Sequence, residues 1–270
     1  MDLDKIRQVA EEYKAMGYPL SVRQLYYMLT DAPTERGCED LNRFIMRAKL
    51  DKSLGWSLVD EPRGILHNTG IGYDYGSPAG ALQTLSREYR LDPWDTQRWR
   101  PEVWIERATV ASSIRGLCRE MLVPWMVCSD EQSLVYRAAG RLMSYAQDFQ
   151  QAPAVLLATD FDPAGIRRRE NIQSVLTGLC GFEVKVYPVA ITMDQVVAHG
   201  IRSSPEAVKD RDYIRLHGDF GYELEAMDPR ALRKAVADTL AQLIDHDAWN
   251  QVLKQQAIDR EYLQRVANSR

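Results

Sequence analysis

The sequence predicts an α/β protein in which a small winged-helix domain of the helix-turn-helix type precedes a mainly parallel sheet flanked by helices. Apolar runs of strand length alternate with helical patterns from residue 101 to residue 189, and such alternation is typical of parallel sheets. The densest apolar run, residues 154–158, leads into two aspartates, as a buried strand does at a sheet edge. Two short helical patterns joined by a Gly/Pro turn precede this region and indicate a helix-turn-helix unit.

The composition is that of an ordinary globular protein. The 270 residues are 45% hydrophobic and 27% charged, and the net charge of −4 argues against a histone-like DNA binder, though not against local basic patches. Four scattered cysteines without a CxxC pair indicate reduced thiols in a cytoplasmic protein. No apolar run approaches the roughly 20 residues of a membrane span, so we expect no membrane association.

Residues 1–67 are predicted to form the winged-helix domain. Ser21 follows a Gly-Tyr-Pro break and is a good N-cap for the second of its helices. The expected elements are helices at residues 3–16, 22–29 and 38–50 and a wing strand at residues 56–59. Basic residues on or just after the third helix are candidates for contacts with DNA phosphates, or they form an exposed charged face: Arg47, Lys49 and Lys52.

Residues 68–100 are predicted to be a linker with one short helix, because their first part is rich in Gly and Tyr and lacks helical periodicity. Residues 101–270 are predicted to form the sheet domain with C-terminal helices, and residues 191–218 to meander. The expected strands are residues 102–105, 122–127, 154–159 and 182–189, and the expected helices are residues 81–90, 108–120, 133–147, 166–176, 230–245 and 248–266.

Three acidic residues follow strands of this sheet at the carboxyl ends, where parallel sheets bind their ligands. Glu106 follows the first strand, and Asp160 and Asp162 follow the central one. Carboxylates two residues apart on an extended chain point the same way and repel each other unless a cation lies between them. Mg²⁺ prefers such oxygen ligands, and Mn²⁺ can replace it. Alternatively, the aspartates cap the following helix and Glu106 forms a salt bridge.

The strand-end glutamate and the later Asp-x-Asp resemble the Toprim domain, which topoisomerases, primases and certain nucleases share. The Asp-x-Asp-Pro-x-Gly pattern at residues 160–165 is similar to the Toprim domain of the topoisomerase VI A subunit and of its relative that makes meiotic breaks. In that family a winged-helix domain comes first and carries a Ser/Thr-x-Arg-x-hydrophobic-aromatic-Tyr motif, which residues 21–27 match. The resemblance implies that Tyr27 is the nucleophile and that Arg23 contacts phosphate.

The resemblance also implies a chemistry and a set of partners. Glu106, Asp160 and Asp162 would hold Mg²⁺, and Tyr27 would cleave double-stranded DNA by transesterification, leaving a 5′-phosphotyrosyl link as in the A subunits of type IIB topoisomerases. The family works as a homodimer with an active site shared between protomers, and its topoisomerases use a separate GHKL-type ATPase B subunit. The chain resembles a compact phage- or plasmid-type member, which implies a cytoplasmic, nucleoid-associated protein.

The residues leave other functions open. Arg23 and Tyr27 are four apart and share one helix face, with Tyr26 expected to pack inward, but both tyrosines suit a structural role equally. The chain then fits a Toprim endonuclease that uses water, or a DNA-binding module with a relic site. Arg167 and Arg168 open the helix after the acids and contact DNA phosphates or form an exposed charged face. The four histidines lack ligand spacing, so no zinc site is predicted.

Overall fold

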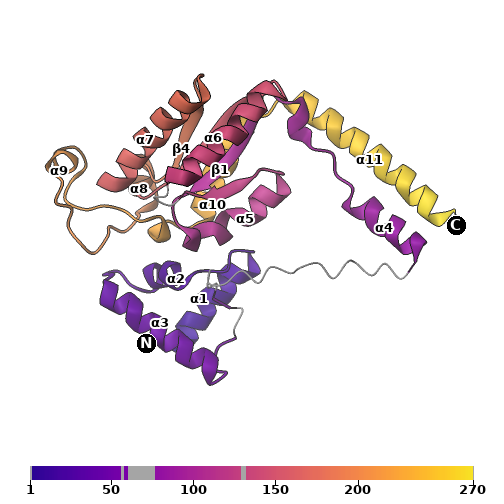
Figure 1. Ribbon diagram of the computed structural model, residues 1–270. Coiled ribbons are helices and arrows are strands. Elements are labelled where there is room, and N and C mark those ends of the chain that lie inside the picture. Colours follow the sequence, from indigo (N-terminus) through magenta and orange to yellow (C-terminus); the bar gives the residue numbers. More distant parts are fainter. Residues whose placement is uncertain (1, 56–57, 60–76, 129–131, 270) are drawn as a thin grey trace. The chain divides into compact units, whose positions relative to one another are not determined.

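The computed structural model describes residues 2–55, 58–59, 77–128 and 132–269 (Figure 1). The chain divides into two compact units. The first combines Met1–Arg63 with Pro101–Gln242, and the second combines Gly64–Arg100 with Leu243–Arg270. The expected domain boundary at residue 67 lies outside the described residues. The N-terminal helices and the sheet therefore belong to one unit, which also holds every predicted site residue.

The predicted parallel sheet is confirmed. Its strand order is β2-β1-β3-β4, and the paired strands run parallel. The central strand β3 is buried from its second residue to its last, which explains its unbroken apolar sequence. The strands are β1 (Trp99–Ile105), β2 (Trp125–Val127), β3 (Ala152–Ala158) and β4 (Lys185–Ala190). The elements that connect them are η2 (Ala108–Val110), α5 (Ala111–Glu120), α6 (Gln132–Gln147) and α7 (Pro163–Cys180).

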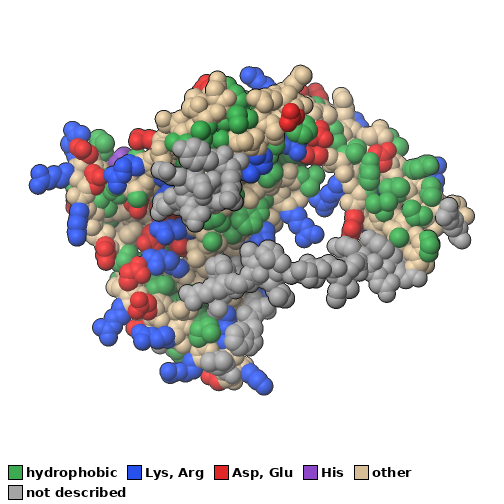
Figure 2. Space-filling model, viewed as in Figure 1, with side chains coloured by type: hydrophobic (Ala, Val, Ile, Leu, Met, Phe, Trp, Pro, Cys, Tyr) green, Lys and Arg blue, Asp and Glu red, His purple; other side chains and the backbone are tan. Residues whose placement is uncertain are grey.

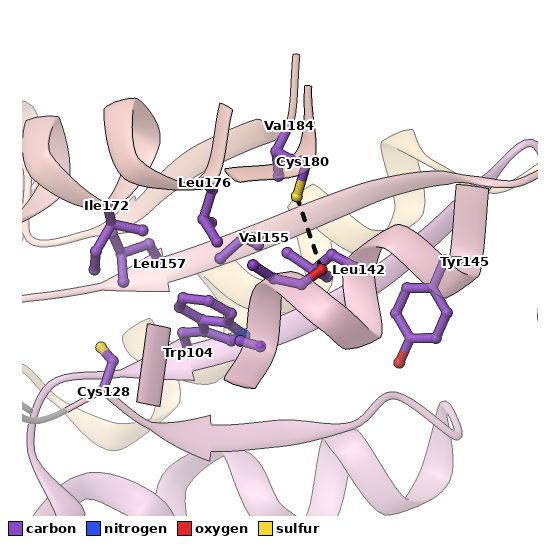
Figure 3. Close-up of a cluster of buried hydrophobic side chains, with 12 residues drawn as sticks. Trp104, Cys128, Leu142, Tyr145, Val155, Leu157, Ile172, Leu176, Cys180 and Val184 are labelled. Atoms are coloured by element: carbon purple, nitrogen blue, oxygen red, sulfur yellow. Dashed lines mark hydrogen bonds between the residues drawn. The ribbon is translucent and has the colours of Figure 1, made fainter. Parts of the chain in front are cut away.

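One core cluster lies where α6 and α7 cover the sheet (Figure 3). Trp104 from β1 and Leu157 from β3 pack there with Leu142 of α6 and Leu176 of α7, and all four side chains are fully buried. Burying side chains of this size stabilises the fold by about 1.5–3 kcal/mol each. This core fixes the positions of β1 and β3, the two strands that carry the predicted acids.

A buried carboxylate, Glu102 of β1, anchors α6 to the same sheet. It accepts hydrogen bonds from Arg141 Nε at 2.6 Å, from the Tyr145 hydroxyl at 2.9 Å and from Trp104 Nε1 at 2.8 Å. A buried charge is stable only when it is paired and hydrogen-bonded in this way. From the sequence, Glu102 is predicted only to be the first residue of a strand, and its role as a buried anchor is a finding of the structure.

The three N-terminal helices form a small core of their own. The helices are α1 (Leu3–Ala15), α2 (Val22–Leu29) and α3 (Glu35–Leu50), close to the predicted ranges. Ser21 caps α2 as expected, in a capping box with Gln24. The predicted wing strand is not confirmed, because residues 56–57 lie outside the described residues and Leu58 and Val59 belong to no strand. The domain is therefore a three-helix unit as far as the structure describes it.

The prediction that residues 191–218 meander is wrong in part. This region holds two short helices, with Thr192 and Asp210 as their N-caps. These helices are α8 (Met193–His199) and α9 (Arg211–His217), and they are followed by η3 (Leu224–Ala226) and α10 (Pro229–Gln242). Helices α8 and α9 are each only seven residues long, which is too short to show a clear apolar period. Their N-cap residues are therefore the signal that the sequence offers for them.

In the second unit, a tryptophan pair joins a segment that precedes the sheet in the sequence to a helix that follows it. Trp94 is buried and meets Trp249 edge to face, with ring centroids 5.1 Å apart. The unit's elements are α4 (Pro78–Glu88), η1 (Pro93–Thr96) and α11 (His246–Asn268). In the described part of the chain, no helix has the length and apolar character needed to cross a membrane.

Candidate functional site

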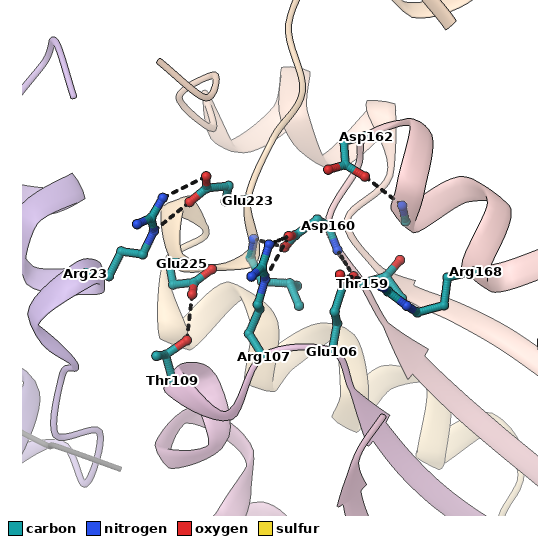
Figure 4. Close-up of polar contacts among 12 residues, drawn as sticks. Arg23, Glu106, Arg107, Thr109, Thr159, Asp160, Asp162, Arg168, Glu223 and Glu225 are labelled. Atoms are coloured by element: carbon teal, nitrogen blue, oxygen red, sulfur yellow. Dashed lines mark hydrogen bonds and ion pairs between the residues drawn. The ribbon is translucent and has the colours of Figure 1, made fainter. Parts of the chain in front are cut away.

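The ends of β1 and β3 bring two of the predicted acids together (Figure 4). Glu106 Oε2 accepts a hydrogen bond from the Asp160 backbone N–H at 3.0 Å, and the Glu106 N–H donates to the Ala158 carbonyl at 2.8 Å. The convergence of Glu106 and Asp160 expected from their strand-end positions is therefore present in the structure.

The third acid, Asp162, serves as a helix cap. Its Oδ1 accepts from the Gly165 N–H at 2.6 Å at the start of α7, which was the alternative interpretation of the aspartate pair. As the described side chains stand, no three His, Cys, Asp or Glu residues form a group that could hold a metal ion. A cation bound by all three acids would require these side chains to rearrange.

Arginines neutralise the two converging acids. Arg107 binds Asp160 Oδ2 through Nε at 2.9 Å and Nη2 at 2.6 Å, and Arg168 forms an ion pair with Glu106. The Leu224 N–H donates to the other Asp160 oxygen, Oδ1, at 2.8 Å. Glu106 therefore has the salt bridge that we considered as its alternative role, and Asp160 uses both of its oxygens.

Two buried carboxyl groups have raised pKa values at this site. Burial, with the nearby Glu106 charge, raises the pKa of Asp160 to about 7 in spite of Arg107. Glu225 is only 3% exposed, and burial raises its pKa as well. Thr109 donates to Glu225 Oε1 at 2.6 Å, while Oε2 has no hydrogen-bond partner among the described residues. Both shifts come mainly from burial, so ionising these two carboxyl groups is costly in the structure as described.

This electrostatic state predicts how stability depends on pH. The folded-state pKa of Asp160, about 7, lies above the unfolded value of about 3.9, so Asp160 contributes stability below pH 4 that is lost as pH rises through 7. We expect Asp160→Asn to match the wild type at pH 4 and to exceed its free energy of unfolding by about 1 kcal/mol or more at pH 8.5 in chelator. Urea denaturation at both pH values measures this difference, and a pH-independent difference would contradict it.

Gly165 explains why the acidic motif ends in glycine. A Cβ at this position would lie 2.1 Å from the backbone oxygen of Asp160, so α7 begins where only a glycine allows the chain to approach so closely. We expect Gly165→Ala to lower the free energy of unfolding by about 2 kcal/mol. Gly178→Ala in the same helix is the matched control, because a Cβ there meets nothing within 4 Å and should be stabilising. Thermal unfolding of the two variants compares them directly.

The predicted nucleophile and the predicted phosphate contact meet at one carboxylate, Glu223. The Tyr27 hydroxyl donates to Glu223 Oε2 at 3.0 Å, and Arg23 donates to the same carboxylate through Nε at 2.7 Å and Nη2 at 2.8 Å. Arg23 also binds Glu35, through Nη2 at 2.6 Å. Arg23 and Tyr27 therefore share one face of α2, as their spacing predicts.

The two adjacent tyrosines differ in their burial. Tyr26 packs against the N-terminal core cluster, as expected, although it is only partly buried, and its hydroxyl accepts from the Thr34 N–H at 3.1 Å. Tyr27 is 5% exposed, and burial together with the Glu223 charge raises the pKa of its hydroxyl. Tyr27 is therefore protonated in this arrangement, and its hydroxyl lies among charged groups and not in an apolar interior.

A short segment missed by the sequence analysis connects the tyrosine to the acids. Glu223 holds Tyr27, the N–H of Leu224 holds Asp160, and Glu225 accepts from Thr109. The segment lies about 60 residues after Asp160 and Asp162 in the sequence and belongs to neither the tyrosine motif nor the Asp-x-Asp-Pro-x-Gly motif. Its one available signal was the pair of glutamates in Tyr-Glu-Leu-Glu-Ala, which flank an apolar residue.

The predicted DNA-contacting residues fall into two groups. Arg47, Lys52 and Arg167 are exposed, and Arg167 also pairs with Asp210 at 2.9 Å. Lys49 is 2% exposed, with Nζ 3.3 Å from the Val59 carbonyl, and its burial contradicts the predicted contact with DNA. Arg168 is directed to Glu106 instead of to the surface. Basic and acidic side chains intermingle on the face drawn in Figure 2.

Comparison of the chain with protein-family models, with curated proteins and with solved structures found no match.

Proposed function

We propose that this chain is a metal-dependent DNA-cleaving enzyme that acts by tyrosine transesterification, like the A subunit of a type IIB topoisomerase. One observation carries the proposal: Tyr27 and Arg23 meet at Glu223, and the next residue holds Asp160 through its backbone N–H. A phenol, a guanidinium and a strand-end carboxylate thus lie along one chain of contacts, and these are group types that can attack, orient and bind a metal in phosphodiester transfer.

In the proposed reaction, Arg23 orients the scissile phosphate and Tyr27 attacks phosphorus. The bond from phosphorus to the 3′ oxygen breaks as the bond to the Tyr27 oxygen forms, which leaves a 5′-phosphotyrosyl link that can be resealed. The planar guanidinium of Arg23 matches two phosphate oxygens and favours the negative charge that develops there.

Glu106 and Asp160, joined by Asp162 when it leaves its capping role, would hold Mg²⁺ or Mn²⁺. The buried Glu225 oxygen that has no hydrogen-bond partner among the described residues supports the fit, because a nearby cation would relieve the cost of burying it. A bound Mg²⁺ neutralises phosphate charge and stabilises the leaving oxygen. Without a cation, Arg107 pairs with Asp160 and Arg168 pairs with Glu106. Both ion pairs would have to open for the carboxylates to bind the cation.

The proposal extends to partners. Exposed Arg47, Lys52 and Arg167 would contact phosphates of double-stranded DNA. A homodimer would make paired cuts in the two strands and would allow an active site shared between protomers. A separate GHKL-type ATPase B subunit would be needed for complete strand passage, and a compact chain of this kind suits a phage or plasmid.

A second candidate function is hydrolysis of DNA by water at the acidic site. The burial of Tyr27 and the raised pKa of its hydroxyl favour this alternative, because a protonated, enclosed phenol is a poor nucleophile. In that case the tyrosines are structural.

The experiment that tests the proposal is incubation of the full chain with supercoiled plasmid and Mg²⁺ or Mn²⁺, stopped with denaturant. We expect linear or nicked DNA that enters the gel only after protease treatment, and we expect none when the ion is removed with a chelator. Cleaved DNA that enters without protease would establish hydrolysis instead, and intact plasmid under all conditions would overturn both candidate functions.

A further inference from the structure

We propose that Glu223 is a catalytic residue that takes the proton from the Tyr27 hydroxyl as the phenol attacks phosphorus. In the absence of DNA, Glu35 binds the part of the Arg23 guanidinium that a DNA phosphate would bind. The inference rests on the proposed function and deepens it. It starts from the two carboxylates bound to Arg23, which differ in position and in exposure.

Glu223 has the geometry of a general base. Its Oε2 lies 3.0 Å from the Tyr27 hydroxyl, within the range for direct proton transfer. Arg23 binds both oxygens of the carboxylate and so fixes its orientation toward the phenol. A nucleophile held by a base that a third group orients is the arrangement that activates hydroxyl nucleophiles in general.

Glu35 is in a different environment from Glu223. The side chain of Glu35 is 54% exposed, whereas that of Glu223 is 17% exposed. Glu35 binds the Nη1 and Nη2 atoms of Arg23, which is the guanidinium edge that a phosphate would meet from solvent. A small pocket lined by Arg23, Tyr27 and Glu35 lies beside this pair. Exchange of Glu35 for a phosphate would leave Glu223 in contact with Tyr27.

The proposed step is balanced in bonds, protons and electrons. The Tyr27 oxygen forms the new bond to phosphorus, its proton moves to Glu223 Oε2, and the electron pair of the broken bond stays on the 3′ oxygen. On resealing, Glu223 returns the proton to the phenol. Other charged or titratable groups also face Tyr27 and contribute to the electrostatic potential at its hydroxyl. They are Arg23 of α2, Glu35 and Cys38 of α3, Arg202 after α8, and Glu225 of η3.

The test compares Glu223→Gln with Glu35→Gln in the plasmid assay, scoring the covalent adduct. Glu223→Gln should lower the rate of adduct formation by about 100-fold or more. Glu35→Gln should form the adduct at least as fast as the wild type and bind a short DNA duplex more tightly. Glu223→Asp, which keeps the charge at a shorter reach, should fall between the wild type and Glu223→Gln.

A readout independent of cleavage is ¹³C NMR of ring-labelled tyrosine. In Glu223→Gln the Cζ resonance of Tyr27, assigned with Tyr27→Phe, should move at neutral pH relative to the wild type, because the phenol no longer donates to a charged carboxylate. Equal adduct rates and an unmoved resonance in Glu223→Gln would overturn the role of Glu223 while leaving the proposed function intact. A wild-type protein that forms no adduct would overturn the proposed function itself.

Discussion

Replacing Tyr27 with phenylalanine is expected to abolish the covalent protein–DNA adduct, lowering its yield by at least about 1000-fold, because the substitution removes the nucleophilic oxygen itself. The phenyl ring keeps the buried packing of Tyr27 and loses only the hydrogen bond to Glu223. The loss of stability should therefore stay near about 1 kcal/mol. Adducts trapped with denaturant and resolved after nuclease digestion measure the yield, and urea denaturation confirms that the variant folds.

Tyr26→Phe is the matched control for this prediction. Its hydroxyl is hydrogen-bonded to Thr34 and, among the described residues, forms no hydrogen bond with Arg23 or Glu223, so the adduct should form at the wild-type level. If Tyr27→Phe still cleaved plasmid at the wild-type rate, the nucleophile would be water and Tyr27 would be structural. If Tyr26→Phe lost the adduct and Tyr27→Phe kept it, the assignment of the nucleophile would move to Tyr26.

Replacing Arg141 with methionine is expected to lower the free energy of unfolding by about 3 kcal/mol. Arg141 supplies two of the hydrogen bonds to the buried Glu102, and methionine removes both of them together with the only positive charge on that carboxylate in the described contacts. Trp104 and Tyr145 remain as donors, which limits the loss. Urea denaturation of the full chain measures the difference.

Two controls separate the buried charge from other effects. Arg43→Met removes an exposed salt bridge to Asp40 on α3 and should cost less than about 1 kcal/mol. Adding Glu102→Gln to Arg141→Met should recover part of the lost stability, because no unpaired charge then stays buried. A loss in Arg141→Met no larger than in Arg43→Met would show that Glu102 reaches water once Arg141 is gone.

The sequence predicted what depends on local periodicity and on strand ends. The helices of the N-terminal domain and the four parallel strands follow from apolar spacing, and the meeting of Glu106 with Asp160 follows from the geometry of a parallel sheet. Asp162 could be interpreted in two ways, since a carboxylate before a Pro-x-Gly helix start suits a cap as well as a metal. In the structure Asp162 forms the cap, a local hydrogen bond with the N–H of Gly165 three residues later.

The contacts that the sequence could not predict join residues far apart in the chain. Arg23 and Glu223 are separated by 200 positions, and Arg107 and Asp160 by 53, so no periodicity links them. Lys49 was misassigned because its stem follows the buried face of α3, which charge alone does not reveal. Such pairings depend on how the elements pack, and sequence patterns within each element do not contain that information.

The single peptide between Glu223 and Leu224 has a thermodynamic consequence. Because Glu223 contacts Arg23 and the next N–H donates to Asp160, we expect a ligand bound at Arg23 and an ion bound at the strand ends to change each other's affinity. Equilibrium linkage is reciprocal: if nucleic acid alters the affinity for a divalent ion by some factor, the ion alters the affinity for nucleic acid by that same factor.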